Sequence, residues 1–167
     1  MSVNIIAAID LNNGLGYKND LLCKLPNDMK HFRSLTENSI VVMGRKTYDS
    51  IGKALPNRLN IILTRNKQYT APIGAFVYQS LNEVIEKYHV QNNNDTELYI
   101  IGGSEIYHQA LQFADQIYLT IIENKFPQAD VYFPEFSLNE WKMISHKRYL
   151  ADNNHQYNYN FLIYSRR

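Results

Sequence analysis

Short apolar runs recur along the whole chain, and their spacing restricts the fold more than any other feature of the sequence. Most are rich in β-branched residues, which is typical of buried strands. They cover residues 3–9, 39–43, 59–64, 75–78, 98–101, 116–122, 141–145 and 157–164. Helical patterns separate them only in the first two-thirds, at 26–35, 44–51, 80–88 and 104–113. The sequence therefore predicts an α/β fold whose sheet is mostly parallel, with an antiparallel C-terminal edge.

Composition narrows the class of protein. A length of 167 residues suits one domain, which we expect over 1–167. The net charge of +1 argues against a nucleic-acid partner, because phosphate contacts need a surplus of Lys and Arg. A single cysteine, Cys23, excludes an intrachain disulfide, and the histidines form no close-spaced metal motif. No apolar run is long enough to span a membrane and no secretory signal is present, so a cytoplasmic location is expected.

One carboxylate lies beside an apolar face. Pro26 suits the first position of the 26–35 helix, and Asp28 then falls in its first turn. Phe32 is its i+4 neighbour on a face that is otherwise apolar. Asp28 is therefore a candidate for acid–base work, although an exposed acid at a helix start is the commoner case.

Two glycine-containing turns follow strands. Gly102-Gly103 can bring backbone N–H groups against a phosphate, or can form only a tight turn. Arg45 and Lys46 follow Gly44, and Arg65 ends a neighbouring strand, so together they can meet a phosphate dianion or simply form a solvated basic surface. Arg58, in a loop, is a candidate clamp for a ligand carboxylate. The glycine- and asparagine-rich segment 10–20 reads as a long loop, of the kind that often forms a lid, and 91–95 as a polar loop.

The order of these features along the chain resembles dihydrofolate reductases. The matching blocks are IAA (6–8), LG (15–16), LPNDMKHF (25–32), VMGRKTYDSIG (42–52), LPNR (55–58), IGGSEIY (101–107) and DVYFP (130–134). The resemblance runs from Val3 to Arg167. It implies a twisted, mainly parallel eight-stranded sheet flanked by helices. It also implies the NADPH-dependent reduction of 7,8-dihydrofolate to tetrahydrofolate in one-carbon metabolism, by hydride transfer to C6 with protonation of N5.

The resemblance assigns roles to particular residues. Asp28 matches the only ionisable side chain of the pterin pocket, where it would accept hydrogen bonds from the ring. Thr120 matches a residue that hydrogen-bonds near Asp28, and Arg58 matches the clamp on the glutamate α-carboxylate of the substrate. Gly102 and Gly103 resemble a Gly-Gly pair usually joined by a cis bond beside the cofactor.

The remaining matches line the two ligand sites. The expected substrate walls are Ile6, Ala8, Leu21, Phe32, Ile51, Leu55 and Ile101. The expected cofactor residues are Ala8, Leu15, Gly16, Gly44, Arg45, Lys46, Thr47, Leu63, Thr64, Arg65, Ile101, Gly102, Gly103, Ser104, Glu105, Ile106 and Tyr107. Arg45, Lys46, Thr64 and Arg65 match the positions around the adenosine 2′-phosphate, which implies a preference for NADP over NAD. No metal site is expected, and the protein is expected to be a monomer with a small-molecule substrate.

One departure stands in the lid. The family commonly carries Pro-Trp where this chain has Leu22-Cys23, and the usual Trp packs over the pterin. Two other functions therefore stay open. The first is a pyrimidine reductase of riboflavin synthesis, which the block from Leu25 to Phe32 argues against. The second is a pterin- or nucleotide-binding module that has lost catalysis.

Overall fold

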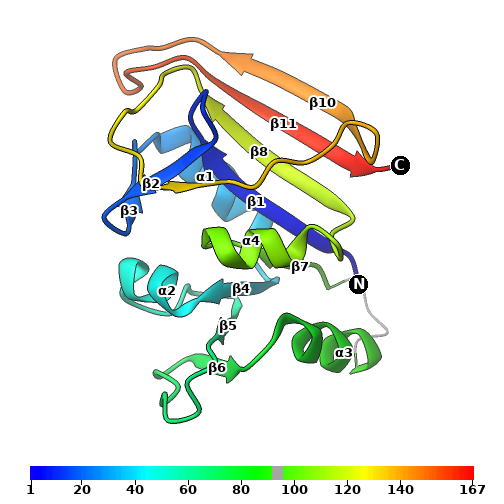
Figure 1. Ribbon diagram of the computed structural model, residues 1–167. Coiled ribbons are helices and arrows are strands. Elements are labelled where there is room, and N and C mark those ends of the chain that lie inside the picture. Colours follow the sequence, from blue (N-terminus) through cyan, green and yellow to red (C-terminus); the bar gives the residue numbers. More distant parts are fainter. Residues whose placement is uncertain (92–95) are drawn as a thin grey trace.

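The computed structural model describes residues 1–91 and 96–167 (Figure 1). Its helices are α1 (Pro26–Thr36), α2 (Arg45–Ile51), α3 (Leu81–Gln91) and α4 (Ser104–Ala110). Its strands are β1 (Val3–Ile9), β2 (Gly14–Tyr17), β3 (Asp20–Leu21), β4 (Ile40–Gly44), β5 (Leu59–Leu63), β6 (Ala75–Tyr78), β7 (Leu98–Ile100), β8 (Gln116–Ile122), β9 (Val131–Tyr132), β10 (Trp141–Tyr149) and β11 (Tyr159–Arg166). Gln91 is the last residue of α3, and the rest of the predicted 91–95 loop lies outside the described residues.

Eight of these strands form one sheet in the order β10-β11-β8-β1-β7-β4-β5-β6. All pairs from β8 to β6 are parallel, whereas β11 runs antiparallel to both β8 and β10. This confirms the mostly parallel sheet with an antiparallel C-terminal edge. The edge consists of two long strands, β10 and β11, which lie along the top of the molecule in Figure 1.

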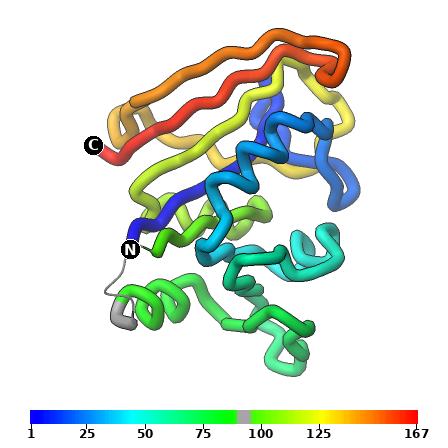
Figure 2. The backbone as a smooth tube through the Cα atoms, turned by 180° about the vertical axis from the view of Figure 1, so that it is seen from behind, coloured from blue at the N-terminus to red at the C-terminus, as the bar shows by residue number. Residues whose placement is uncertain are grey.

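Strand alternation sends successive side chains to opposite faces of the sheet. One face packs against α3 and α4, in a core that includes Ile5, Val42, Ile100 and Tyr107. Figures 1 and 2 show α1 on the other face. There Val41, Met43 and Ile62 pack with Tyr48 and Ile51 of α2. Ile6, Ala8 and Thr120 alternate with residues of the first core, so they point to the face that α1 covers.

The segment 10–20 differs from the predicted loop, because it contains a small hairpin. β2 pairs with β3 and with β9, forming a second, three-stranded sheet. Lys18 and Asn19 connect β2 and β3 with positive φ angles of 48° and 61°. Positive φ at both central residues is typical of the two-residue hairpin turn whose twist matches that of the flanking strands. Asn-Gly is the strong sequence signal for this turn, and Lys-Asn is a much weaker one.

Candidate active site

Asp28 is held against the sheet by a residue far away in sequence. Its carboxylate Oδ1 accepts a hydrogen bond of 2.6 Å from the Oγ1 hydroxyl of Thr120 in β8. Thr120 is only 3% exposed, so the bond forms away from bulk water. Burial raises the pKa of Asp28, and the Thr120 bond opposes that rise only in part. The pair predicted for Asp28 and Thr120 therefore exists, and it leaves one carboxylate oxygen for a ligand.

The raised pKa of Asp28 makes a prediction about stability. A carboxyl whose pKa is higher in the folded state favours folding when it is protonated, so this contribution is present at low pH and is lost as pH rises. Replacing Asp28 with Asn should therefore raise the free energy of unfolding at pH 7. The gain should shrink below pH 4. Urea unfolding of both proteins at the two pH values checks this, and a variant less stable at pH 7 would contradict it.

The predicted apolar walls lie on the α1 and α2 side of the sheet. Ile51, Leu55 and Ile101 pack against a core that contains Met43 and Tyr48. Ile6 and Ala8 share their face with Thr120, whereas Leu21, in β3, is 52% exposed. Phe32 is half-buried. The structure thus places most of these side chains on one face of the sheet and leaves Leu21 at the surface of the hairpin.

The Gly102-Gly103 turn comes directly against the end of β4. The peptide bond between the two glycines is cis, as expected, and the N–H of Gly44 donates to the carbonyl of Gly102 at 2.8 Å. Gly102 has a φ of 129°, and a Cβ there would lie 3.3 Å from Thr47 Oγ1. A Cβ on Gly103 would lie 3.4 Å from the same oxygen. Bare backbone at the ends of two parallel strands suits the close approach of a dinucleotide.

The basic residues predicted for a phosphate lie around this turn. Arg45 and Lys46 are exposed in the first turn of α2. Arg65 follows β5 and pairs with Glu105 of α4, with Arg65 Nη2 2.5 Å from Glu105 Oε1. Both side chains are largely exposed, so the pair adds little stability. Arg65 can therefore exchange this partner for a phosphate at small cost.

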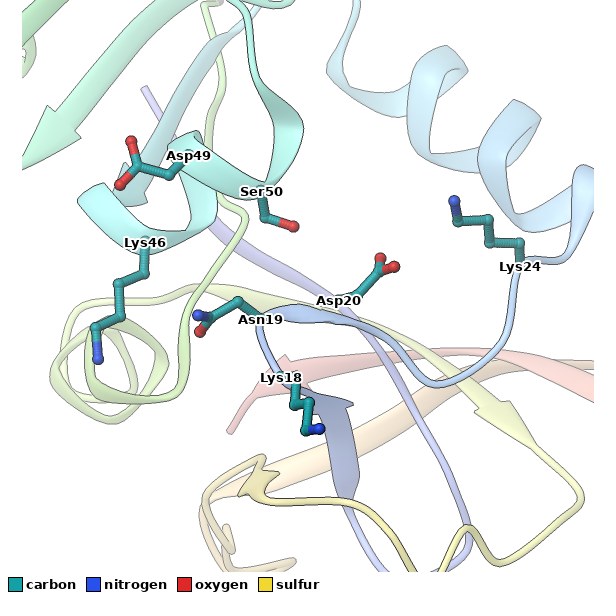
Figure 3. Close-up of a pocket in the computed structure, with 7 residues that line it drawn as sticks. All are labelled: Lys18, Asn19, Asp20, Lys24, Lys46, Asp49 and Ser50. Carbon is teal, nitrogen blue, oxygen red and sulfur yellow. The ribbon is translucent and has the colours of Figure 1, made fainter.

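The cleft between the hairpin and α2 is polar. It has a volume of about 430 Å³ and is lined by Lys18, Asn19, Asp20, Lys24, Lys46, Asp49 and Ser50. Figure 3 shows these side chains on the β2–β3 hairpin, before α1 and on α2, around one opening. The cleft connects the segment predicted as a lid with the helix that carries Arg45 and Lys46.

The hairpin is fixed at its base by a buried acid that the sequence did not single out. Asp10 is 1% exposed and its carboxylate accepts bonds from the N–H groups of Asn12, Gly14 and Phe126, at 2.7–2.9 Å. Further out, the N–H of Lys18 donates to Asp130 Oδ2 at 3.0 Å. Asp10 thus sets where the predicted lid begins.

Arg58 is placed by a second residue that sequence reasoning missed. Asn60 is 1% exposed, and its amide bonds to the backbone of Leu55 and to the carbonyl of Arg58. This fixes the loop that carries both predicted ligand residues. In the described part of the chain, Arg58 Nε is buried with no hydrogen-bond partner, and burial lowers the pKa of its guanidinium. A buried donor without a partner is rare, so Arg58 suits an anionic ligand group.

Cys23 packs into an apolar cluster. The thiol is half-buried and packs against a cluster of Leu25, Ile122 and Tyr159 that aromatic side chains extend. Burial raises the pKa of the thiol, and the nearby Asp28 raises it further. Cys23 is thus a packing residue in its neutral form at pH 7, and not an activated nucleophile.

A mostly parallel sheet with bare glycines and cations at its strand ends, and a half-buried acid on the adjacent face, fits a nucleotide-dependent α/β reductase. The family model described as dihydrofolate reductase matches residues 2–166. The chain belongs to the dihydrofolate reductase family.

Individual members of this family are similar to the chain in sequence and in structure. The dihydrofolate reductase of Bacillus subtilis (strain 168) is 36% identical, over 99% of this chain and 95% of that protein. The dihydrofolate reductase of Staphylococcus aureus (strain MSSA476) is 34% identical, over 87% of this chain and 86% of that protein. A solved dihydrofolate reductase from Enterococcus faecalis, complexed with NADP(H) and RAB-propyl, superposes with a TM-score of 0.90 at 30% identity. That alignment covers 99% of this chain and 96% of the other.

Proposed function

We propose that this protein catalyses the NADPH-dependent reduction of 7,8-dihydrofolate to 5,6,7,8-tetrahydrofolate. The observation that carries the proposal is the Asp28–Thr120 pair, a desolvated carboxylate on the sheet face opposite α3 and α4. Neither alternative accounts for it as well. A pyrimidine reductase needs no such acid together with Arg58, and a binding module without catalysis needs no desolvated carboxylate beside the sheet.

Asp28 would bind and orient the heterocycle. A carboxylate with Thr120 on one oxygen can accept hydrogen bonds from the ring N3–H and 2-amino groups, which form a charge-assisted pair in a dry site. Asp28 then favours protonation at N5 through the ring, with water delivering the proton. Arg58 binds the glutamate α-carboxylate through its guanidinium.

The glycine turn and the surrounding cations fit a phosphorylated dinucleotide. The bare protein backbone would let the dinucleotide approach closely at Gly44, Gly102 and Gly103. Its 2′-phosphate would be bound by Arg45, Lys46 and Arg65. Bound NADPH supplies the hydride for C6 of the substrate. The protein's own part is to align the two rings and exclude water, for which the half-buried apolar residues Ile51, Leu55 and Ile101 are suited.

A direct assay tests the proposal. Protein, NADPH and dihydrofolate are mixed and the loss of reduced-nicotinamide absorbance is followed. Turnover supports a dihydrofolate reductase. Turnover only with a ribosylated aminopyrimidine would support the riboflavin-pathway enzyme. Tight binding of both ligands without turnover would support the binding module.

Removing the phosphate-binding cations should change cofactor preference. We expect Arg45→Ala combined with Arg65→Ala to reduce the NADPH-to-NADH ratio of kcat/KM roughly 10- to 100-fold, because NADH lacks the 2′-phosphate. The matched control is Lys142→Ala with Lys147→Ala, which removes the same charge from exposed positions on β10. An unaltered ratio in the Arg variant would place the phosphate elsewhere.

We further propose that the chain acts as one domain over 1–167, as a monomer in the cytoplasm, with a small molecule and no nucleic acid as partner. The net charge of only +1 supports the absence of a nucleic-acid partner. No helix of the described residues is long and apolar enough to cross a membrane. Gel filtration tests the monomeric state.

A further inference from the structure

The helix that carries Asp28 is capped by a histidine from the other end of the chain. The N-cap residue of α1, Leu25, offers no side-chain acceptor. His155, in the loop between β10 and β11, takes its place: its Nε2 accepts a hydrogen bond of 3.1 Å from the backbone N–H of Asn27. His155 is 3% exposed. One of the free N–H groups of the first turn is therefore bound by an imidazole and not by water.

This bond determines the tautomer of His155. Since Nε2 accepts a hydrogen bond from the backbone N–H of Asn27, it carries no proton itself, and the ring hydrogen must be on Nδ1. Nδ1 lies 2.8 Å from Asp152 Oδ1, so it donates to that carboxylate. The bond from His155 and the N–H of Asn154 hold the pKa of Asp152 below its usual range. Asp152, His155 and Asn27 thus form a directed chain of hydrogen bonds that ends one residue before Asp28.

Asn27 is also held through its side chain. Its Nδ2 donates to the hydroxyl of Tyr159 at 2.6 Å, and the Tyr159 ring stacks on His155 with a centroid distance of 5.0 Å. Both the backbone and the side chain of Asn27 are therefore anchored to the β10–β11 end of the molecule. Asp28, which follows directly, is anchored to β8 through Thr120.

We propose that His155 is a positioning residue for Asp28: as a neutral imidazole oriented by Asp152, it fixes the first turn of α1 and so the direction of the carboxylate that holds the substrate. This inference rests on the proposed function for the identity of the substrate. It extends that function, because the loop between β10 and β11 then controls substrate binding without touching the substrate.

The hydrogen bond to Asn27 requires a bare Nε2. A proton on Nε2 would make it a donor that faces the N–H donor of Asn27, so the geometry fits the neutral imidazole that donates from Nδ1 to Asp152.

Two substitutions of His155 distinguish the role of its hydrogen-bond acceptor from that of its aromatic ring. His155→Phe keeps an aromatic ring against Tyr159 and removes the acceptor, whereas His155→Gln offers an amide oxygen in its place. At pH 8 we expect kcat/KM for dihydrofolate to fall about tenfold in His155→Phe, the size of effect associated with one lost cap, and to recover largely in His155→Gln. The dissociation constant for NADPH should stay unchanged in both. His89→Gln, an exposed histidine on α3, is the control.

Cofactor affinity distinguishes positioning from a general loss of structure. The loss of kcat/KM in His155→Phe should not be accompanied by a loss of NADPH affinity. An equal loss of NADPH affinity, or no recovery of kcat/KM in His155→Gln, would overturn the proposal.

A measurement on the ligand-free protein separates this inference from the proposed function. Nitrogen-15 NMR of wild type should show a protonated Nδ1 and a bare Nε2 on His155. The carboxyl carbon-13 signal of Asp28 should shift in His155→Phe and return toward its wild-type position in His155→Gln. The opposite tautomer, or an Asp28 carboxyl signal identical in wild type and His155→Phe, would refute the inference, whatever substrate the enzyme uses.

Discussion

Replacing Asp28 with Asn is expected to lower kcat at pH 7 by about 10²- to 10⁴-fold. Asn keeps the size of the side chain and can still accept the Thr120 bond, so the fold and the apolar walls should be preserved. What it loses is the charge that pairs with two ring donors and that favours a proton at N5. The affinity for NADPH should stay within about twofold, since the glycine turn and the cations around it do not contact Asp28. Steady-state kinetics and NADPH titration together measure both quantities.

A matched control uses an exposed acid that lines the polar cleft. Asp49 of α2 is exposed and lines the polar opening in Figure 3, so Asp49→Asn removes one negative charge from the same region without touching the desolvated carboxylate. We expect its kcat to stay near that of the wild type. If Asp28→Asn turned over dihydrofolate as fast as this control, Asp28 would have no part in the reaction.

The order and type of the main strands and helices could be predicted because each is set by local pattern. β6 and β8 have the bounds expected from their apolar runs, and α1 ends one residue later than expected. The N–H of Glu83 donates a hydrogen bond to the hydroxyl oxygen of Ser80, as the S-x-x-E spacing at the start of the 80–88 helix suggests. β10 continues to Tyr149, well beyond the predicted end at residue 145. The prediction stopped too early because the later residues of this strand are exposed and partly charged, so they show no alternation of apolar and polar side chains.

The candidate site could be predicted only in part, because its supports are long-range contacts. Asp28 and Thr120 are 92 positions apart, and their pairing followed from a family resemblance and not from spacing. His155 and Asn27 are 128 positions apart, and Asp10 reaches Phe126 across 116. A buried polar residue in a loop gives no periodic signal, so Asp10, Asn60 and His155 could be found only from the fold.

The second large effect is expected at Arg58. Replacing Arg58 with Leu should weaken dihydrofolate binding by about 2–5 kcal/mol, or roughly 30- to several-thousand-fold, since the substrate α-carboxylate would lose the guanidinium that pairs with it. The isolated protein should not be destabilised, because Arg58 Nε is buried without a partner in the described structure and the substitution removes that group. Calorimetric titration of dihydrofolate and thermal unfolding of the free protein measure the two effects.

A truncated substrate decides whether this loss belongs to the glutamate. A dihydropterin that lacks the glutamate tail cannot contact a guanidinium placed by the Leu55–Asn60 loop, so Arg58→Leu should leave its binding nearly unchanged. Asp28→Asn should weaken both ligands alike, because both present the same ring to the Asp28–Thr120 pair. The two variants and two ligands thus form a cycle in which Arg58 couples to the tail and Asp28 does not. Equal losses for both ligands in Arg58→Leu would mean that Arg58 acts on the ring pocket, and the clamp assignment would be wrong.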